Sequence, residues 1–321
     1  MKQHAAVEVE ALVMAYGDRK ALNGVSFEVD EGENFGFLGP NGGGKTTLLR
    51  ILSTLLTPSS GLARIFGMDL ISNVRDVRRR IGVVFQSQNV DGKLTCMENL
   101  RHQGHLYGLQ GMVLKKRIGE VLHRVGLADR NDDLAETLSG GLRRRLEIAK
   151  GLIHRPGLLL LDEPTTGLDL GARLDLWEYL AQLRQQEGVT VLFTTHLLEE
   201  AERCDRLAIL HQGSFVASGS VETLKKEVGA EVVLLETNHP EALRDRLQSR
   251  FSIEGAILGG RVRFEHPLGH EIISSLMETF PGDIQSATVS KPTLEDVFIH
   301  RTGHQFWNNG AIERGLGKSS R

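Results

Sequence analysis

The sequence predicts an α/β fold in which a layered domain with a parallel sheet is followed by a smaller α+β domain. Strand-like and helix-like segments alternate between residues 34 and 218, and the four consecutive leucines from Leu158 to Leu161 fit a strand buried on both faces. After Lys226 the order changes to strand, helix, strand, strand, helix, strand. That order is typical of a small ferredoxin-like unit.

Length and composition agree with two folded domains. The chain has 321 residues, more than one compact core usually spans, and 40% of them are hydrophobic and 25% charged. We place the first domain at residues 5–222 and the second at 228–302, and we expect residues 303–321, which are polar and contain glycine, to form a disordered tail.

Charge and hydropathy exclude several classes of protein. The net charge of -3 gives no broad basic surface, so we expect no nucleic-acid partner. The two cysteines, Cys96 and Cys204, lack metal-ligand spacing and are expected to have no chemical role. Glu8 and Glu10 stand where a secretory peptide needs an apolar core, and there is no apolar run of 18 residues. We therefore expect a cytosolic chain that reaches a membrane only through a partner.

The elements of the first domain follow from periodicity. Alternating residues predict an antiparallel edge, and continuous apolar runs predict buried strands. The expected strands are 7–9, 25–29, 34–38, 81–85, 158–161 and 189–194, with a hairpin of 207–210 and 215–218 around Gln212 and Gly213. Helical spacing is expected from Leu48 to Leu55, within a helical subdomain at about 92–155, and from 172 to 187.

The second domain is assigned in the same way. Strands are expected at 231–236, 255–258, 261–265 and 284–289, and helices at 241–248 and 271–279. Gly259 and Gly260 form the turn of the hairpin.

A glycine-rich segment between the strand at 34–38 and the following helix matches the pattern G-x-x-x-x-G-K-[ST] of a P-loop. It consists of Gly39, Pro40, Asn41, Gly42, Gly43, Gly44, Lys45, Thr46 and Thr47. Glycines let successive backbone N–H groups and the helix N-terminus point at phosphate oxygens, and Lys45 adds a positive charge. We expect the hydroxyl of Thr46 to bind Mg²⁺.

Two acidic residues end the four-leucine strand. Asp162 can approach the Mg²⁺ beside Thr46, and Glu163 can orient and deprotonate a water molecule. Phosphoryl transfer needs mainly positioning and compensation of charge, so these two acids suffice for hydrolysis. Glu163 is the candidate general base.

A second anion site is expected where Ser139, Gly140 and Gly141 open a helix. By itself, such a segment is most often only a helix cap. A chain that binds one nucleotide has no evident use for a second site, unless two copies face each other and each closes the nucleotide of the other.

These motifs together resemble the ATP-binding cassette (ABC) family over residues 5–220, with ATP as the substrate and Mg²⁺ as its cofactor. The resemblance implies that Gly39 to Thr47 form the Walker A loop, that Leu138 to Gly141 form the family signature and that Asp162 and Glu163 are the Walker B pair. It further implies that Tyr16 stacks on adenine, that Gln86 acts in catalysis and binds the metal with Thr46 and Asp162, that Asp169 lies near the nucleotide and that His196 contacts the γ-phosphate.

Two single residues and one run of three arginines lie in or beside these motifs. Leu142 replaces the glutamine that many family members have after the signature, and Gly43 is expected to make the loop slightly more flexible. The run Arg143, Arg144 and Arg145 is expected to form a solvated helix face rather than a nucleic-acid patch.

The segment from Pro292 to Phe298 resembles the C-terminal element of cassettes that serve ABC-2 type exporters of drugs, lipids or glycans. This resemblance implies a second copy of the chain and a separately encoded ABC-2 type permease as partners, at the cytoplasmic face of the membrane. Residues from Gln86 to about Tyr107 would grip a helix of that permease. Two alternatives stay open here: a cytosolic ABC-family ATPase with a non-membrane partner, and a P-loop phosphotransferase.

Overall fold

The computed structural model describes residues 5–87, 89–229, 231–303 and 306, and divides the chain into two compact units, Met1–Phe215 and Val216–Arg321. The division falls within strand β10 (Ser214–Ser220). Most of the tail expected at 303–321 lies outside the described residues. Within that range, Gly303 caps a helix and Phe306 is buried against Phe298.

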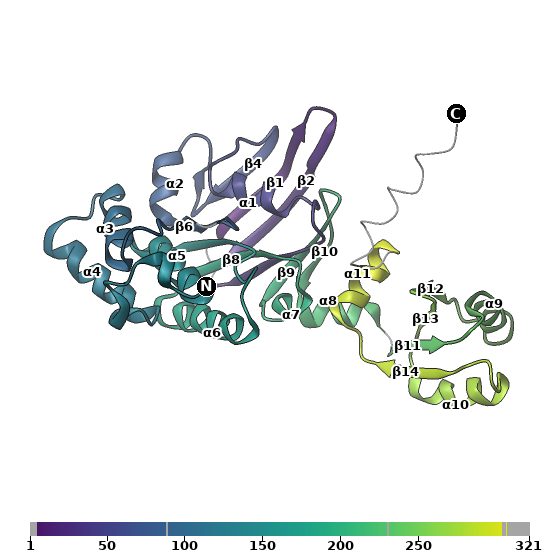
Figure 1. Ribbon diagram of the computed structural model, residues 1–321. Helices are drawn as coiled ribbons and strands as arrows, with labels where there is room; N and C mark the ends of the chain where they lie inside the picture. Colours follow the sequence, from purple (N-terminus) through teal and green to yellow (C-terminus); the bar gives the residue numbers. More distant parts are fainter. Residues whose placement is uncertain (1–4, 88, 230, 304–305, 307–321) are drawn as a thin grey trace, which may run out of the picture. The chain divides into compact units, whose positions relative to one another are not determined.

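The first unit contains two sheets (Figure 1). An antiparallel sheet has the order β2-β1-β4-β5 and consists of β1 (Ala5–Tyr16), β2 (Arg19–Asp30), β4 (Ser60–Ile65) and β5 (Met68–Asp69). β1 and β2 are longer than the strands expected at 7–9 and 25–29, and no element was expected at residues 60–80. That region forms β4, β5 and helix α2 (Val74–Arg80).

The second sheet has the order β10-β9-β3-β8-β7-β6. Its strands are β3 (Asn34–Leu38), β6 (Ile81–Val84), β7 (Leu158–Asp162), β8 (Thr190–Thr195), β9 (Arg206–His211) and β10. Strands β9, β3, β8, β7 and β6 run parallel to their neighbours in that order. The parallel sheet predicted from the four leucines is confirmed.

The leucines of β7 show why this sheet is buried on both faces. Leu158 and Leu160 pack into a core with α1 (Lys45–Leu52) and the antiparallel sheet, whereas Leu159 and Leu161 pack into a core with the helices on the other side. Successive side chains of a strand point to opposite faces, so an uninterrupted apolar run is what a central strand needs.

The helical subdomain expected at about 92–155 is present. It contains α3 (Cys96–Leu106), α4 (Gly111–Arg124), α5 (Gly140–Leu152) and two short 3₁₀ turns, η1 (Ala128–Arg130) and η2 (Ala135–Thr137). Two more helices of this unit, α6 (Leu170–Glu187) and α7 (Leu198–Ala201), follow β7 and β8. Within the described ranges, none of the helices has the length and hydropathy of a membrane span.

The second unit has the strand order β12-β13-β11-β14, with every neighbouring pair antiparallel. After α8 (Val221–Val228), its elements are β11 (Glu231–Glu236), α9 (Pro240–Phe251), β12 (Ala256–Leu258), β13 (Arg261–His266), α10 (Gly269–Thr279), β14 (Ser286–Ser290) and α11 (Leu294–Thr302). β13 lies between β12 and β11, as in the split βαβ arrangement of ferredoxin-like folds.

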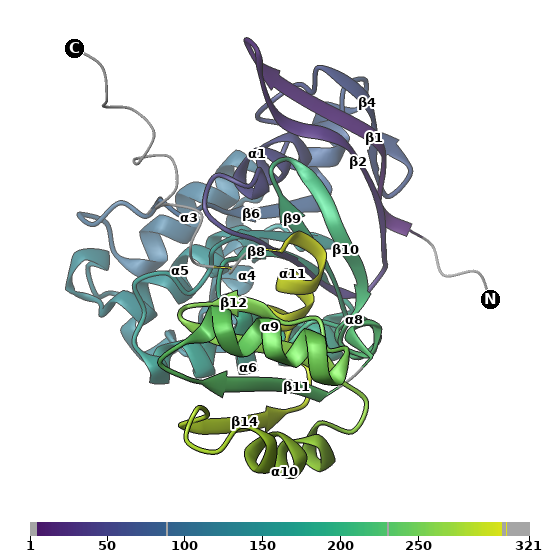
Figure 2. The same cartoon turned by 90° about the vertical axis from the view of Figure 1, so that its right-hand side faces the viewer.

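Opposite faces of this small sheet have different partners (Figure 2). Val233 and Phe264 share one core with leucines of α9 and α10, so both helices cover the same face. Arg263 points the other way and makes a buried ion pair with Asp296 of α11. Asp296 also completes a capping box with Thr293 at the start of α11.

Candidate active site

The loop from β3 to α1 has the tight geometry that a phosphate cradle requires. A Cβ at Gly39 would lie 2.2 Å from the Leu210 carbonyl, and Gly44 has a φ of +110° with the Ala21 carbonyl 2.5 Å from where its Cβ would be. Only glycine fits both positions. The helix α1 begins directly after Gly44, so its unpaired N–H groups open toward the loop.

Lys45 is buried beneath this loop. Its ammonium donates to the carbonyls of Gly39 (2.7 Å) and Pro40 (3.1 Å), and lies 3.9 Å from Glu163 Oε1. Burial lowers the pKa of Lys45, and the carboxylates of Glu163 and Asp162 oppose that shift. The charge is therefore held where phosphate oxygens can replace carbonyls as its partners.

Four side chains converge on the Glu163 carboxylate. Gln86 Nε2 and Thr166 Oγ1 each donate to Oε2 at 3.2 Å, while His196 Nδ1 lies 3.1 Å from Oε1 on the side of Lys45. The structure thus brings together Gln86, Glu163 and His196, the three residues nominated as catalytic. A carboxylate held this way at the carboxyl end of a parallel strand can accept a proton from water.

The backbone of Glu163 is also unusual. Its φ is +45°, in the left-handed region that residues other than glycine rarely adopt. The N–H of Glu163 donates to the hydroxyl (3.0 Å) and carbonyl (3.2 Å) of Thr194 on the neighbouring strand. This conformation directs the Glu163 side chain away from the sheet and toward the loop.

Asp162 and Thr46 are two of the three residues expected to hold Mg²⁺, and Gln86 is the third. Thr46 Oγ1 donates to Asp162 Oδ1 at 3.3 Å, and Thr194 Oγ1 donates to the same oxygen at 2.6 Å. Burial raises the pKa of Asp162, and the hydrogen bonds from Thr194 and Thr46 oppose that shift.

One hydroxyl and one carboxylate are the donor set that Mg²⁺ takes beside phosphate oxygens, so these residues fit the ion. When bound there, Mg²⁺ would offset negative charge on the phosphate oxygens. The described residues contain no cluster of three or more acidic, His or Cys side chains suited to a metal.

A cavity of about 560 Å³ opens above the loop. Its lining includes Tyr16, Lys45, Thr46, Gln86 and Glu163, and Tyr16 is half exposed. Arg19 also lines the cavity, although the sequence analysis did not nominate it. Arg19 is the first residue of β2 and pairs with Tyr16 across the hairpin, and its place three residues after Tyr16 was the available signal.

The signature residues do not line this cavity. Ser139 caps α5 by accepting from the N–H of Leu142 at 3.4 Å, and Ser139 and Gly140 are exposed. Asp169, also exposed, caps α6 beside them, since a Cβ at Gly141 would lie 2.8 Å from that of Ala172 in the first turn of α6. These residues therefore form a second polar surface.

The expectation that Arg143, Arg144 and Arg145 form a solvated face is wrong for Arg144. Its side chain is 9% exposed and pairs with Glu147, which is 2% exposed. Arg144 lies on the face of α5 that also buries Glu147 and Ile148, because positions three and four apart share a helix face.

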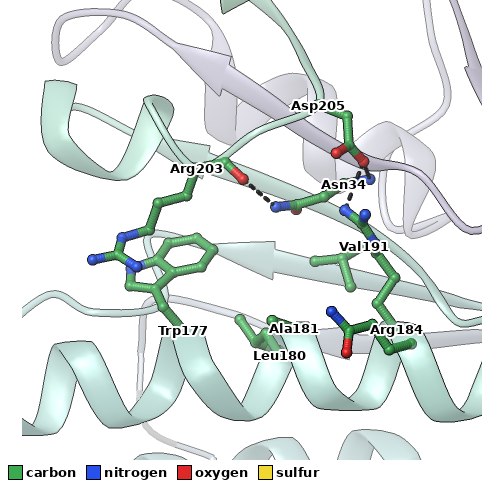
Figure 3. A pocket seen from close by; sticks show the side chains of 9 residues that line it. Asn34, Trp177, Leu180, Ala181, Arg184, Val191, Arg203 and Asp205 are labelled. Carbon is green, nitrogen blue, oxygen red and sulfur yellow. Dashed lines mark hydrogen bonds and ion pairs between the residues drawn. The ribbon is translucent and has the colours of Figure 1, made fainter.

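A second cavity, of about 290 Å³, lies at the amino ends of β3 and β8 (Figure 3). Asn34, the first residue of β3, donates its amide to the Arg203 carbonyl, and Asp205 accepts from Arg184 and from the N–H of Asn34. Ligands of open parallel sheets bind at the carboxyl ends of the strands, so the P-loop cavity is the candidate site.

Comparison with known proteins agrees with this geometry. The sequence profile described as "ABC transporter" matches residues 22–166. The daunorubicin/doxorubicin resistance ATP-binding protein DrrA of Streptomyces peucetius is 38% identical over 309 residues, covering 93% of each chain. Nod factor export ATP-binding protein I of Burkholderia orbicola is 38% identical over 304 residues, covering 94% of this chain and 98% of that protein.

Two solved structures have a similar fold. The cbiO1 protein of Clostridium perfringens, part of the ABC transporter complex cbiONQ, aligns with a TM-score of 0.65 and 26% identity over 78% of this chain and 97% of its own. The dimeric cassette MJ0796 bound to ADP and phosphate aligns with a TM-score of 0.61 and 29% identity over 67% of this chain and 98% of its own. With its P-loop, acidic strand end and signature helix, the chain belongs to the ABC transporter family and is one of its ATPases.

Proposed function

We propose that this ATPase powers an ABC-2 type exporter as a pair of identical copies bound to a separately encoded permease. Relatives that match nearly the whole chain are named for drug resistance and Nod factor export. The match extends through the second unit, which carries the segment from Pro292 to Phe298. A drug, lipid or glycan is the cargo class that this branch of the family implies.

One observation carries the proposed dimer: the N-terminus of α5 lies outside the nucleotide cavity of its own chain. Ser139 and Gly140 are exposed there, next to the exposed cap Asp169. A helix N-terminus binds anions, and a two-fold axis would place this one over the nucleotide of the other copy. The solved cassette MJ0796, which is dimeric, agrees with this arrangement.

In the proposed mechanism, each residue near the cavity has a separate task. Backbone N–H groups from Gly39 to Thr47 and the ammonium of Lys45 bind the phosphates, and Tyr16 stacks on adenine. Thr46 and Asp162, with Gln86, hold Mg²⁺. Glu163 accepts the proton of the attacking water as the bond to the γ-phosphate breaks, and His196 orients that phosphate.

Two defective variants tested in mixture decide whether the site is shared. Lys45→Ala removes the positive charge proposed to bind phosphate, and Ser139→Arg blocks the polar surface at the start of α5. Each variant alone is therefore expected to be inactive. A mixed pair contains one complete site, formed by Lys45 of one chain and Ser139 of the other. Random pairing should restore about a quarter of wild-type turnover per chain. Mixtures that stay inactive, or full turnover by strictly monomeric wild-type protein, would overturn the dimer.

The base assignment has its own test. Glu163→Gln keeps the size of the side chain and should leave ATP binding intact, while turnover falls and a closed dimer accumulates in size-exclusion chromatography with light scattering. Normal hydrolysis by this variant would remove Glu163 from the mechanism.

The membrane partner is tested by co-expression with a neighbouring six-span permease. We expect the chain to co-purify with the permease in detergent. In the cell, we expect it to bind the permease at the cytoplasmic face of the membrane. Residues from Gln86 to about Tyr107 form the proposed contact. Recovery with ribosomes or DNA instead would favour the cytosolic alternative, and ATP-dependent phosphorylation of a small substrate would favour the phosphotransferase.

A further inference from the structure

Arg144 donates to the backbone of the segment that carries Glu163. Its Nε donates to the Pro164 carbonyl at 2.8 Å, and Nη2 donates to the carbonyls of Asp162 at 3.2 Å and Glu163 at 3.5 Å. These three carbonyls are consecutive and surround the residue with the left-handed backbone. One guanidinium therefore holds the turn that aims the Glu163 side chain.

The same guanidinium also holds the strand end that carries Gln86. Arg144 Nη1 donates to the Phe85 carbonyl and to Glu147 Oε2, both at 2.7 Å. A guanidinium has five N–H groups, and Arg144 makes five such hydrogen bonds. Glu147 then accepts from the N–H of Asn89 at 3.0 Å, so α5 contacts the loop on both sides of Gln86.

These contacts connect two surfaces that the chain otherwise separates. Ser139 caps α5 and Arg144 lies five residues further along the same helix, so both move with α5 as one rigid element. The Arg144 side chain pairs with Glu147. The carbonyls that it contacts belong to the last residue of β7, to the two residues after it and to the first residue after β6. A displacement of Ser139 is thereby passed to the backbone that places Gln86 and Glu163.

We propose that Arg144 is a positioning residue that aligns Glu163 and Gln86 for hydrolysis. This alignment depends on the position of α5, and therefore on whether Ser139 has bound a nucleotide. This inference rests on the proposed roles of Glu163 and Ser139. Arg144 does not line the nucleotide cavity, so it affects turnover rather than ATP affinity.

A purely structural role is the competing explanation. Breaking a buried ion pair by removing one partner destabilises a protein, whereas replacing both partners by apolar residues is often neutral. The double variant Arg144→Met with Glu147→Leu removes the charges together. We expect it to keep the thermal midpoint of the wild type and still lose turnover.

Arg144→Lys is the sharper variant, because an ammonium keeps the charge but has only three donors and no planar fork. We expect kcat to fall about 10- to 100-fold, as for other small misplacements of reacting groups, while the KM for ATP and the Kd for MgADP stay within about twofold. Arg145→Lys is the matched control. Arg145 is the next residue of the same helix and makes a surface ion pair with Asp175, so its replacement should change neither constant.

The decisive measurement places Arg144→Lys in the Glu163→Gln background. If Arg144 acts mainly through Glu163, Arg144→Lys should lower the residual turnover of Glu163→Gln much less than it lowers the turnover of the unmodified chain. Wild-type turnover by Arg144→Lys, a KM that rises in step with the loss of kcat, or an equal fall in both backgrounds would overturn the inference. Turnover that survives Glu163→Gln alone would instead overturn the base assignment, and the effect of Arg144→Lys in the unmodified chain would still be read independently.

Discussion

The ammonium of Lys45 lies 3.9 Å from the carboxylate of Glu163, and both side chains are less than one tenth exposed. This contact couples the residue proposed to bind phosphate to the residue proposed to activate water. Since each stabilises the charge of the other, a change at Glu163 should alter how Lys45 titrates.

The first prediction concerns that titration. Burial lowers the pKa of Lys45 from its ordinary value of 10.5, and Glu163 limits the shift. Phosphate binds the charged form, so MgADP affinity should fall as the pH rises through the lowered pKa. In Glu163→Gln the fall should begin at a lower pH, measured by titration calorimetry at a series of alkaline pH values. Coincident curves for the two proteins would show that the carboxylate does not support the charge.

The second prediction concerns Gly44. In Gly44→Ala the new methyl group would have to share the space of the Ala21 carbonyl at a φ of +110°. The loop cannot then keep its shape, so we expect MgADP affinity to fall at least about tenfold. Gly119→Ala is the control, because that glycine lies within α4 with nothing near its Cβ position. It should raise the free energy of unfolding by up to about 1 kcal/mol without a change in affinity.

The third prediction concerns Tyr16. Its half-exposed ring lines the cavity, and stacking of a base on an aromatic ring is worth about 1–3 kcal/mol. Tyr16→Ala should raise the KM for ATP about tenfold with little change in kcat. Tyr16→Phe should keep wild-type kinetics. If Tyr16→Ala also keeps them, the base stacks elsewhere and Arg19 becomes the residue to replace.

The fourth prediction concerns His154, which joins the helical subdomain to β6. Its Nε2 donates to the Ile81 carbonyl at 2.9 Å, and its ring stacks on Tyr107 with centroids 3.7 Å apart. Burial lowers the pKa of His154 from 6.5 to about 4. As the pH falls below 6.5, His154 takes up a proton in the unfolded chain before it does so in the folded one. The contribution of neutral His154 to the free energy of unfolding is therefore present above pH 6.5 and is lost as the pH falls toward 4.

The free energy of unfolding should fall by about 3 kcal/mol at most between pH 6.5 and pH 4, and urea unfolding over this pH range measures the fall. His154→Gln can donate to the same carbonyl without titrating, so its stability should depend less on pH by that amount. His102→Gln, at an exposed position of α3, should follow the wild type. A wild type and a His154→Gln variant with parallel pH profiles would contradict the prediction.

Much of the fold could be predicted because the pattern of apolar residues within a short segment indicates which of its faces are buried. The four leucines of β7 have no polar alternation, and that is possible only in a strand with apolar neighbours on both faces. Strand β4 was missed because its partner β1 lies about 50 residues earlier in the chain and its own residues alternate weakly. Strand β5 pairs with β4 and has only two residues, too few to show a pattern. Long-range pairing of this kind leaves little trace in a short window.

The candidate site divides in the same way. The P-loop and the acidic pair are contiguous segments, so residue type and spacing were enough to locate them. Arg144 was misplaced because three adjacent arginines suggest a charged surface, while its burial depends on carbonyls from two other strand ends. Glu147, three residues later on the same helix face, was the usable signal.

The left-handed backbone of Glu163 has a consequence for how this protein tolerates change. A residue with a side chain costs about 1 kcal/mol in that conformation, and glycine adopts it freely. Glu163→Gly should therefore relax the turn while removing the proposed proton acceptor, so the variant expected to be inactive would lack a backbone strain that the wild type retains. Selection for a more stable fold would favour glycine at position 163, whereas selection for turnover would favour glutamate.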